Sequence, residues 1–184
     1  MTTMLARCTP ALLALPLLAA APAQQGDPLR SVYTTLDPAQ CRTIRTYEET
    51  GDSEQRCPGI AGHVLLVSDG DARVSVTVVT PDRRQHPLDY WTVITSGFSS
   101  LGPRAEWRVR GTGRALRPVA LIVRVNANED PEVPERRTSY LAVARLTGGR
   151  VCVTHRIGPY ANANELARQA ADRAGTLPCL GPRQ

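Results

Sequence analysis

The sequence contains no lysine, so all 22 of its basic residues are arginines. A chain without lysine has no Schiff-base or lysine general-base chemistry, and it cannot form a phosphate-binding loop that depends on a lysine. Aromatic residues are scarce as well, with five Tyr, two Trp and one Phe. Because single-stranded nucleic acids are held largely by stacking on aromatic side chains, this scarcity argues against a nucleic-acid partner.

Sequence motifs for cofactors, metals and covalent catalysis are also missing. There is no G-x-G-x-x-G after a strand, no H-E-x-x-H, no G-x-S-x-G and no C-x-x-C. The three histidines, His63, His86 and His155, are scattered along the chain. The sequence therefore predicts no cofactor and no metal site, and it assigns no catalytic residue.

Two acidic stretches are candidates for a cation site, and each has a simpler explanation. Asp69-Gly70-Asp71 is typical of a hairpin turn, and its two carboxylates fall short of the six to eight oxygens that calcium takes. Residues 129–135 hold four carboxylates, but nothing in their spacing makes the oxygens converge. We expect both stretches, and the acidic residues 48–54, to be solvated loops.

The N-terminal residues 1–23 have the pattern of a signal peptide. Arg7 gives a positive start, an apolar run follows from Ala11 to Ala21, and Ala21-Pro22-Ala23 places small residues before a cleavage point. The predicted mature chain begins at Gln24 and has lost Arg7, which lowers the formal net charge from +5 to +4. The apolar run is too short to span a bilayer, and no later stretch is longer, so no transmembrane segment is expected.

Four cysteines remain after this cleavage, and in an exported chain they predict two disulfides. A strand from Cys152 to Ile157 advances about 17 Å. A helix over residues 163–174 returns about 18 Å. Cys179 is therefore expected beside Cys152, which leaves Cys41 to pair with Cys57.

Alternation and turn residues predict one exported domain over residues 24–184, of the α+β class and mainly β. Val74, Val76 and Val78 share one face of a strand, with Arg73, Ser75 and Thr77 on the other. We expect an antiparallel meander of six to seven strands, with a polar and mobile lead at 24–33. Residues 81–105 form a long excursion with a short strand at 91–94.

One helix is expected at the C-terminus, from residue 163 to residue 174. Asn162 and Glu165 suit its start and Gly175 its end. Its apolar stripe would pack on the sheet. The stripe consists of Ala163, Leu166, Ala167, Ala170, Ala171 and Ala174.

Arginines, unlike the acids, lie within predicted strands. Arg108 and Arg110 alternate with Trp107 and Val109, and so face away from the apolar side. If neighbouring strands align, the arginines form a basic face suited to carboxylate or phosphate groups. The other reading is an ordinary sheet face with each arginine paired to an acid. The tentative ligand-binding set is Arg73, Arg108, Arg110, Arg124 and Arg156.

Several short motifs resemble a group of uncharacterised exported (periplasmic) proteins of Gram-negative bacteria. They include residues 33–37 with Cys41, Cys57-Pro58-Gly59, residues 106–108 and residues 162–168. The resemblance covers most of the predicted mature chain. It implies export and a shared fold, and no catalytic residue is carried across.

Two functions remain open at the level of the sequence. The preferred one is a non-enzymatic periplasmic or secreted binding module that holds an anionic ligand or an envelope partner on the arginine-bearing face. The alternative is a hydrolase of cell-envelope material with its site in residues 81–105. That site would use Ser99, Ser100, His86 and Asp89.

Overall fold

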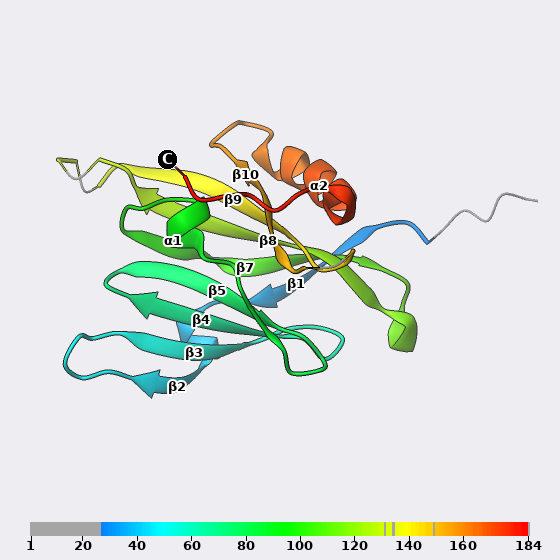
Figure 1. The fold of residues 1–184 in the computed structure, drawn as a ribbon, viewed down its shortest axis with the longest axis horizontal. Helices are drawn as coiled ribbons and strands as arrows, with labels where there is room; N and C mark the ends of the chain where they lie inside the picture. The colour runs from blue at the N-terminus through cyan, green and yellow to red at the C-terminus, as the bar shows by residue number, and fades with distance from the viewer. Residues whose placement is uncertain (1–26, 131, 134, 149, 184) are drawn as a thin grey trace, which may run out of the picture.

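The computed structural model describes residues 27–130, 132–133, 135–148 and 150–183. The expected signal peptide and its cleavage point lie outside these residues. β-strand is the main secondary structure of the described chain, with a long helix near the C-terminus and a one-turn helix in the middle (Figure 1). No helix among the described residues has the length and apolar character needed to cross a membrane.

Ten strands and two α-helices make up the described fold. The strands are β1 (Arg30–Thr35), β2 (Arg42–Thr46), β3 (Ser53–Pro58), β4 (Val64–Gly70), β5 (Arg73–Val79), β6 (Gln85–Pro87), β7 (Ser99–Arg110), β8 (Arg117–Asn128), β9 (Arg137–Arg145) and β10 (Cys152–Ile157). The helices are α1 (Tyr90–Val93) and α2 (Ala163–Arg173). Short 3₁₀ turns occupy Pro38–Gln40, Gly113–Ala115 and Ala174–Thr176.

The ten strands form one mixed sheet, so the expectation of a purely antiparallel meander of six to seven strands is wrong. The order is β10-β9-β8-β7-β5-β4-β3-β2, with β1 added to β7 and β6 added to β5. All pairs are antiparallel except β5 with β7, which meet at Arg73 and Ser99. The parallel pair arises because the chain leaves the far end of β5, passes through β6 and α1, and returns to start β7 beside the start of β5.

β7 joins the two halves of the sheet. Its first residue pairs with β5, and Arg104–Val109 pair with β1 instead. Inward side chains of both halves lie in one hydrophobic core, for example Val76 on β5 and Trp107 on β7. The His63 and Trp107 rings also meet edge to face, with centroids 5.9 Å apart. The two halves therefore enclose a common core.

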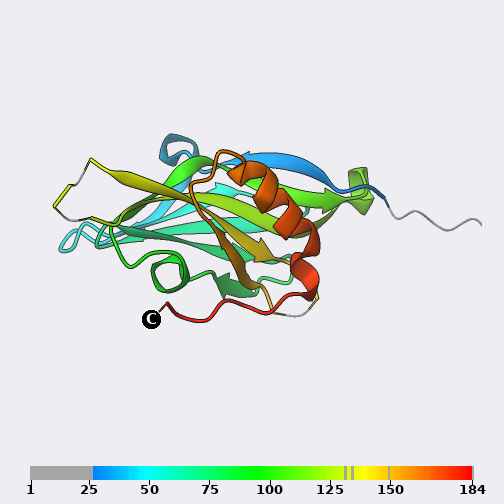
Figure 2. The ribbon, with the colours of Figure 1, turned by 90° about the horizontal axis from the view of Figure 1, so that it is seen from above.

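The other face of the β8–β9 region is covered by α2 (Figure 2). Ile122 on β8 and Val143 on β9 project into a second cluster with the small side chains of the helix. The expected apolar stripe is confirmed except for Leu166, which is only half-buried. The buried helical residues are Ala163, Ala167, Ala170 and Ala171.

Three further expectations differ from the structure. Residues 91–94 do not form a strand, because Tyr90–Val93 is one helical turn that buries Tyr90. Residues 30–33, expected in a polar lead, belong to β1, which needs no apolar pattern because neither of its faces is fully buried. The acidic loop ends earlier than expected, since Ser53 already begins β3.

Two disulfides join Cys41 to Cys57 and Cys152 to Cys179, the same two pairs that the sequence predicts. The first links the 3₁₀ turn after β1 to the end of β3, and the sulfur-bearing Cys57 side chain lies in the main core. The second links the start of β10 to the chain that follows α2. Both bonds therefore fix segments that the backbone ladders alone do not hold.

Candidate functional site

The five arginines singled out from the sequence do not form one basic face. Arg108 lies beneath α2 and is only 8% exposed. It donates from Nε and Nη2 to the two carboxylate oxygens of Asp172, at 2.7 and 2.9 Å. Arg124, on the same side of the sheet, donates to Ser139 Oγ at 2.6 Å and to Asn164 Oδ1 at 2.9 Å. Both guanidinium groups bind within the protein.

The other three arginines lie elsewhere. Arg73, on β5, pairs with the Asp71 carboxylate and stacks on Phe98, with Cζ 4.9 Å from the ring centroid. Arg156, on β10, stacks on Tyr140 at 3.7 Å.

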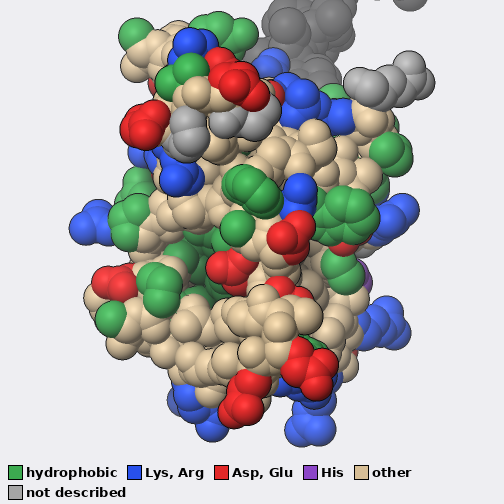
Figure 3. All heavy atoms as spheres, turned by 90° about the vertical axis from the view of Figure 1, so that its left-hand side faces the viewer, with side chains coloured by type: hydrophobic (Ala, Val, Ile, Leu, Met, Phe, Trp, Pro, Cys, Tyr) green, Lys and Arg blue, Asp and Glu red, His purple; other side chains and the backbone are tan. Residues whose placement is uncertain are grey.

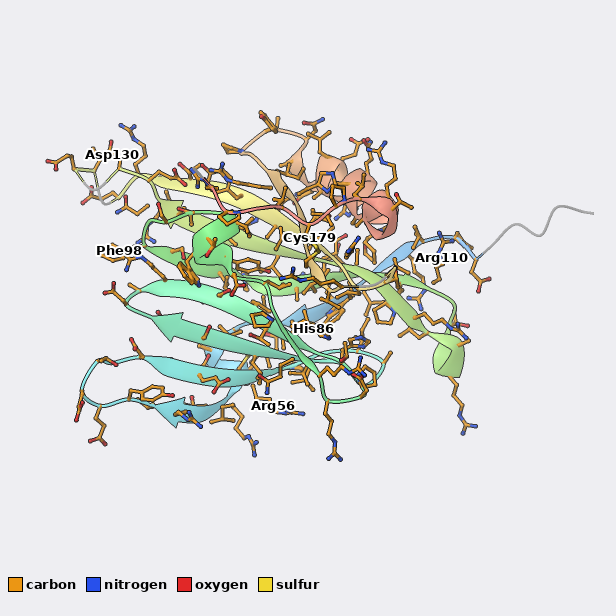
Figure 4. All side chains as sticks on the ribbon, viewed as in Figure 1. Arg56, His86, Phe98, Arg110, Asp130 and Cys179 are labelled. Atoms are coloured by element: carbon orange, nitrogen blue, oxygen red, sulfur yellow. A yellow bond between two sulfur atoms is a disulfide. The ribbon has the colours of Figure 1, made fainter. Side chains whose placement is uncertain are left out.

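Arg110 lies near the opposite end of the molecule from Phe98 and Asp130 (Figure 4). Its Nη1 donates to the backbone oxygen of Asp27 at 3.0 Å. The reading in which each arginine is paired to an acid holds for Arg73, Arg108 and Arg156. Arg110 and Arg124 donate to uncharged groups instead.

The residues of the hydrolase alternative are not brought together. Ser99 pairs with Arg73, whereas His86 pairs with Val78, five residues further along β5. A strand rises about 3.3 Å per residue, so these positions are about 17 Å apart along the strand. Ser99 Oγ also accepts a hydrogen bond from the backbone N–H of Val74 and is buried.

The other two residues of the hydrolase alternative also do not form a catalytic group with Ser99 and His86. Ser100 is exposed on β7, and Asp89 lies before α1. In the part of the chain that the structure describes, no group of three or more His, Cys, Asp or Glu side chains is placed to hold a metal ion.

The antiparallel sheet brings the two acidic segments of the sequence to the same end of the molecule. The β2–β3 and β8–β9 connections both lie at the left of Figure 1, although they are far apart in the sequence. Seen from that end, carboxylate and apolar side chains surround a hollow (Figure 3). From the sequence, the two acidic segments were expected to be separate loops, and their position at one end of the molecule was not predicted.

A groove of about 450 Å³ opens at this end of the β3–β4–β5 region. Its size falls in the range of ligand sites, about 300–1,000 Å³. Two exposed aromatic side chains flank it, Tyr47 from the β2–β3 turn and Trp91 from α1. The other lining residues are Asp52, Ser53, Glu54, Ser68, Asp69, Gly70, Arg73, Ser75, Thr77, Pro87 and Asp89.

The groove is acidic although the chain as a whole carries a formal charge of +5. Four carboxylates line it, against a single arginine that already pairs with Asp71. Burial raises the pKa of Asp69, and the neighbouring carboxylate of Asp52 raises it further. The two acids repel one another, so a cation between them would be favoured.

Asp89 and Trp91 form the wall contributed by α1. Asp89 has a left-handed backbone, with φ 46° and ψ 50°, and its side chain does not cap the helix that it precedes. For a residue other than glycine this conformation is strained. Trp91 is 56% exposed, the most exposed tryptophan of the chain. Indole gives the strongest cation–π interaction of the aromatic side chains.

The sequence alone did not identify Tyr47, Asp52, Trp91 and Asp89 as parts of one site. The available signal was weak: an acidic loop lay next to a strand, and Asp69 lay in the following hairpin. Since consecutive antiparallel strands are neighbours, that order brings the two acidic turns together. The contribution of α1 had no sequence signal, because residues 91–94 suited a strand equally well.

No protein family, no curated protein and no solved structure matches this chain, so its function is inferred from the groove itself.

Proposed function

We propose that the protein is a non-enzymatic binding module that acts in the periplasm or outside the cell after loss of residues 1–23, and that its acidic groove holds a positively charged segment of an envelope partner. The observation that carries this proposal is the groove itself, which is lined by four carboxylates and two exposed aromatic rings. This ligand is cationic rather than anionic, because the arginines of the expected basic face are spread over the molecule and each contacts another group of the protein.

The chemistry of the groove suits guanidinium and ammonium groups. Carboxylates accept charge-assisted hydrogen bonds from such groups, in bidentate form from arginine. The rings of Tyr47 and Trp91 offer π faces to the same cations. Tyr47 already shows this contact within the chain, since Arg45 Cζ lies 5.7 Å from its ring centroid and Arg45 Nη1 donates to its hydroxyl at 2.8 Å.

Export is consistent with the two disulfides, because such bonds persist in oxidising compartments. A small exported domain with a preformed groove needs no cofactor to bind a peptide segment. Strands β3, β4, β5 and β6 supply most of the groove lining, and the β2–β3 turn and the α1 region supply the rest. Binding sites are commonly built in this way on a rigid scaffold.

Isothermal titration with a tetra-arginine peptide, blocked at both ends, tests the proposal. We expect wild-type protein to bind this peptide and not tetra-glutamine. The double variant Asp52→Asn/Asp69→Asn should weaken binding about tenfold or more, since two charged contacts are lost. Trp91→Ala should weaken it as well, through loss of the cation–π contact.

The matched control is Glu132→Gln/Glu135→Gln, which removes the same charge from exposed positions of the β8–β9 connection at the same end. Equal weakening by both double variants would mean that the peptide senses only the general negative potential of this end. That result, or no binding of tetra-arginine by the wild type, overturns the assignment of the groove.

A further inference from the structure

The C-terminal strap, defined here as residues 177–183, runs from the end of α2 back along β10 to α1. Both ribbon views show its end beside the one-turn helix (Figures 1 and 2). The strap is attached along the way by the bond between Cys152 and Cys179. It is also attached by the backbone N–H of Leu180, which donates to Val153 O at 2.8 Å.

The start of the strap is held by an arginine side chain of β9. Arg145, on β9, donates from Nη1 to Leu177 O at 2.8 Å and from Nε to Arg150 O at 2.8 Å. The same guanidinium lies against the disulfide, with Nη2 3.8 Å from Cys179 Sγ. The strap is therefore fixed at its beginning and middle before it reaches α1.

Arg183 makes the final attachment, and it binds the carbonyl end of α1. Its backbone N–H donates to Thr92 O at 3.1 Å, and its Nη1 donates to Ile94 O. Nη1 also lies 3.6 Å from Glu129 Oε1 on the β8–β9 connection. A cation at a helix C-terminus is favourable because the last carbonyls have no partner within the helix.

The helix that Arg183 binds has little stability of its own. It has four residues, and a single helical turn is not stable in water without tertiary contacts. Its first residue is fixed by burial of the Tyr90 side chain and by the Tyr90 N–H, which donates to Ser75 Oγ at 3.1 Å. At the other end Ile94 is buried in the main core, and the contacts of Arg183 add a second attachment there.

We propose that Arg183 is a positioning residue for the groove, and that the C-terminal strap is a latch that holds the Asp89–Trp91 wall in place. With the latch closed, α1 presents Trp91 and Asp89 to the groove. With it open, the carbonyl end of α1 loses its partners and the wall loosens. The effect on ligand affinity rests on the proposed function; the effect on α1 itself does not.

Hydrogen exchange followed by NMR on the full-length protein tests the latch. The reporters are the backbone N–H groups of Ile94 and Thr95, which both donate to Tyr90 O. Arg183→Ala should speed their exchange about tenfold, the change that corresponds to one charge-assisted interaction. Amides in the centres of β8 and β9 should keep their rates, because they do not depend on the strap.

Two variants separate positioning from a general loss of stability. Both Arg183→Ala and Arg183→Lys keep the backbone N–H that donates to Thr92 O. Arg183→Lys also keeps a cation on the side chain, so it should restore part of the protection. Arg114→Ala removes an exposed arginine from the opposite end of the sheet and should leave α1 unchanged. If the amides of Ile94 and Thr95 exchange at the same rate in Arg183→Ala as in Arg114→Ala, the latch is overturned.

Tetra-arginine titration of the same variants distinguishes this inference from the proposed function. Faster exchange with weaker peptide binding in Arg183→Ala supports both. If exchange is faster in Arg183→Ala and the wild type binds no peptide, the latch is supported and the proposed function is overturned. Wild-type binding with unchanged exchange and affinity in Arg183→Ala overturns the latch alone.

Discussion

Arg108 on β7 and Asp172 on α2 face one another through two parallel hydrogen bonds, from Nε at 2.7 Å and from Nη2 at 2.9 Å. The arginine side chain is 9% exposed and the aspartate side chain 33%. Ser31 of β1 accepts a third hydrogen bond from Nη1 of the arginine, at 2.7 Å. This one guanidinium therefore ties the helix to two strands.

Asp172→Ala should lower the free energy of unfolding by about 2–4 kcal/mol, because it leaves the Arg108 charge buried without its partner. The double variant Arg108→Met/Asp172→Leu removes both charges and should recover most of that loss. Urea denaturation of the wild type and the two variants measures this. A double variant as unstable as Asp172→Ala would contradict the explanation.

The neighbouring acid Glu106 should make stability depend on pH. Burial opposes its ionisation, but hydrogen bonds from Arg168 and Ser31 outweigh that effect and hold the pKa of Glu106 below its ordinary value of 4.5. Its stabilisation is therefore present above pH 4.5 and is lost as the pH falls through the lower pKa of the folded state.

Glu106→Gln should thus destabilise the protein at pH 7, and the difference from wild type should shrink below pH 4.5. Unfolding free energies at a series of pH values provide the measurement. Glu49→Gln, in the exposed β2–β3 turn, serves as the control. A difference between wild type and Glu106→Gln that stays constant across the acid range would argue against this role.

Ligand binding should weaken in acid at a pH higher than ordinary aspartates would give. Burial and the nearby Asp52 raise the pKa of Asp69 above 3.8, so Asp69 gains its proton early as the pH falls. The groove then loses charge, and tetra-arginine affinity should fall. Asp69→Asn should remove this early part of the pH profile. An identical pH profile of tetra-arginine affinity in the wild type and in Asp69→Asn would contradict the assignment of this early loss to Asp69.

Gly97 should not tolerate a side chain. A Cβ at this position would lie 2.1 Å from the backbone oxygen of Asn128, at the end of β8. Gly97→Ala should therefore cost about 1–3 kcal/mol of stability, through a shift of the α1–β7 connection. Gly70→Ala is the matched control, since its Cβ would have nothing within 4 Å. Equal thermal shifts in the two variants would contradict this account.

Removal of either disulfide should cost about 3 kcal/mol, because each closes a short loop in the unfolded chain. The closed loops span 16 and 27 residues. Denaturation of Cys41→Ala/Cys57→Ala and of Cys152→Ala/Cys179→Ala measures the two contributions. Peptide mapping without reduction checks the pairing itself, and a fragment that joins Cys41 to Cys152 would be inconsistent with it.

Regular patterns allowed much of the fold to be predicted from the sequence. Alternation identified β5, since Val74, Val76 and Val78 are all buried. Small residues at helical spacing identified α2. Prediction failed where tertiary contacts decide the structure. Residues 99–105 were expected to belong to the 81–105 excursion, yet they form the first part of β7, because a register shift between Leu101 and Ala105 accommodates Gly102 and Pro103.

The candidate site was much less accessible from the sequence. The arginines do lie within strands, but a sequence does not show which group each arginine contacts. Asp172, for example, lies 64 residues after Arg108. The acidic groove depends on the order of three strands and on a helical turn that the pattern around Trp91 did not distinguish from a strand. Residues that line a groove from several strands and helices share no sequence periodicity, and only the fold brings them together.

The position of β1 has a consequence for the order in which the protein is assembled. Arg30 and Thr35 pair with Val109 and Arg104, so β1, the first strand of the described residues, pairs with no other described strand until β7 has been made. The hairpins of β2 to β5 can form earlier, and oxidation of Cys41 and Cys57 needs only that region. Late docking of β1 is a contact of long sequence separation, which slows folding. A nascent chain that stops before residue 104 leaves β1 unpaired.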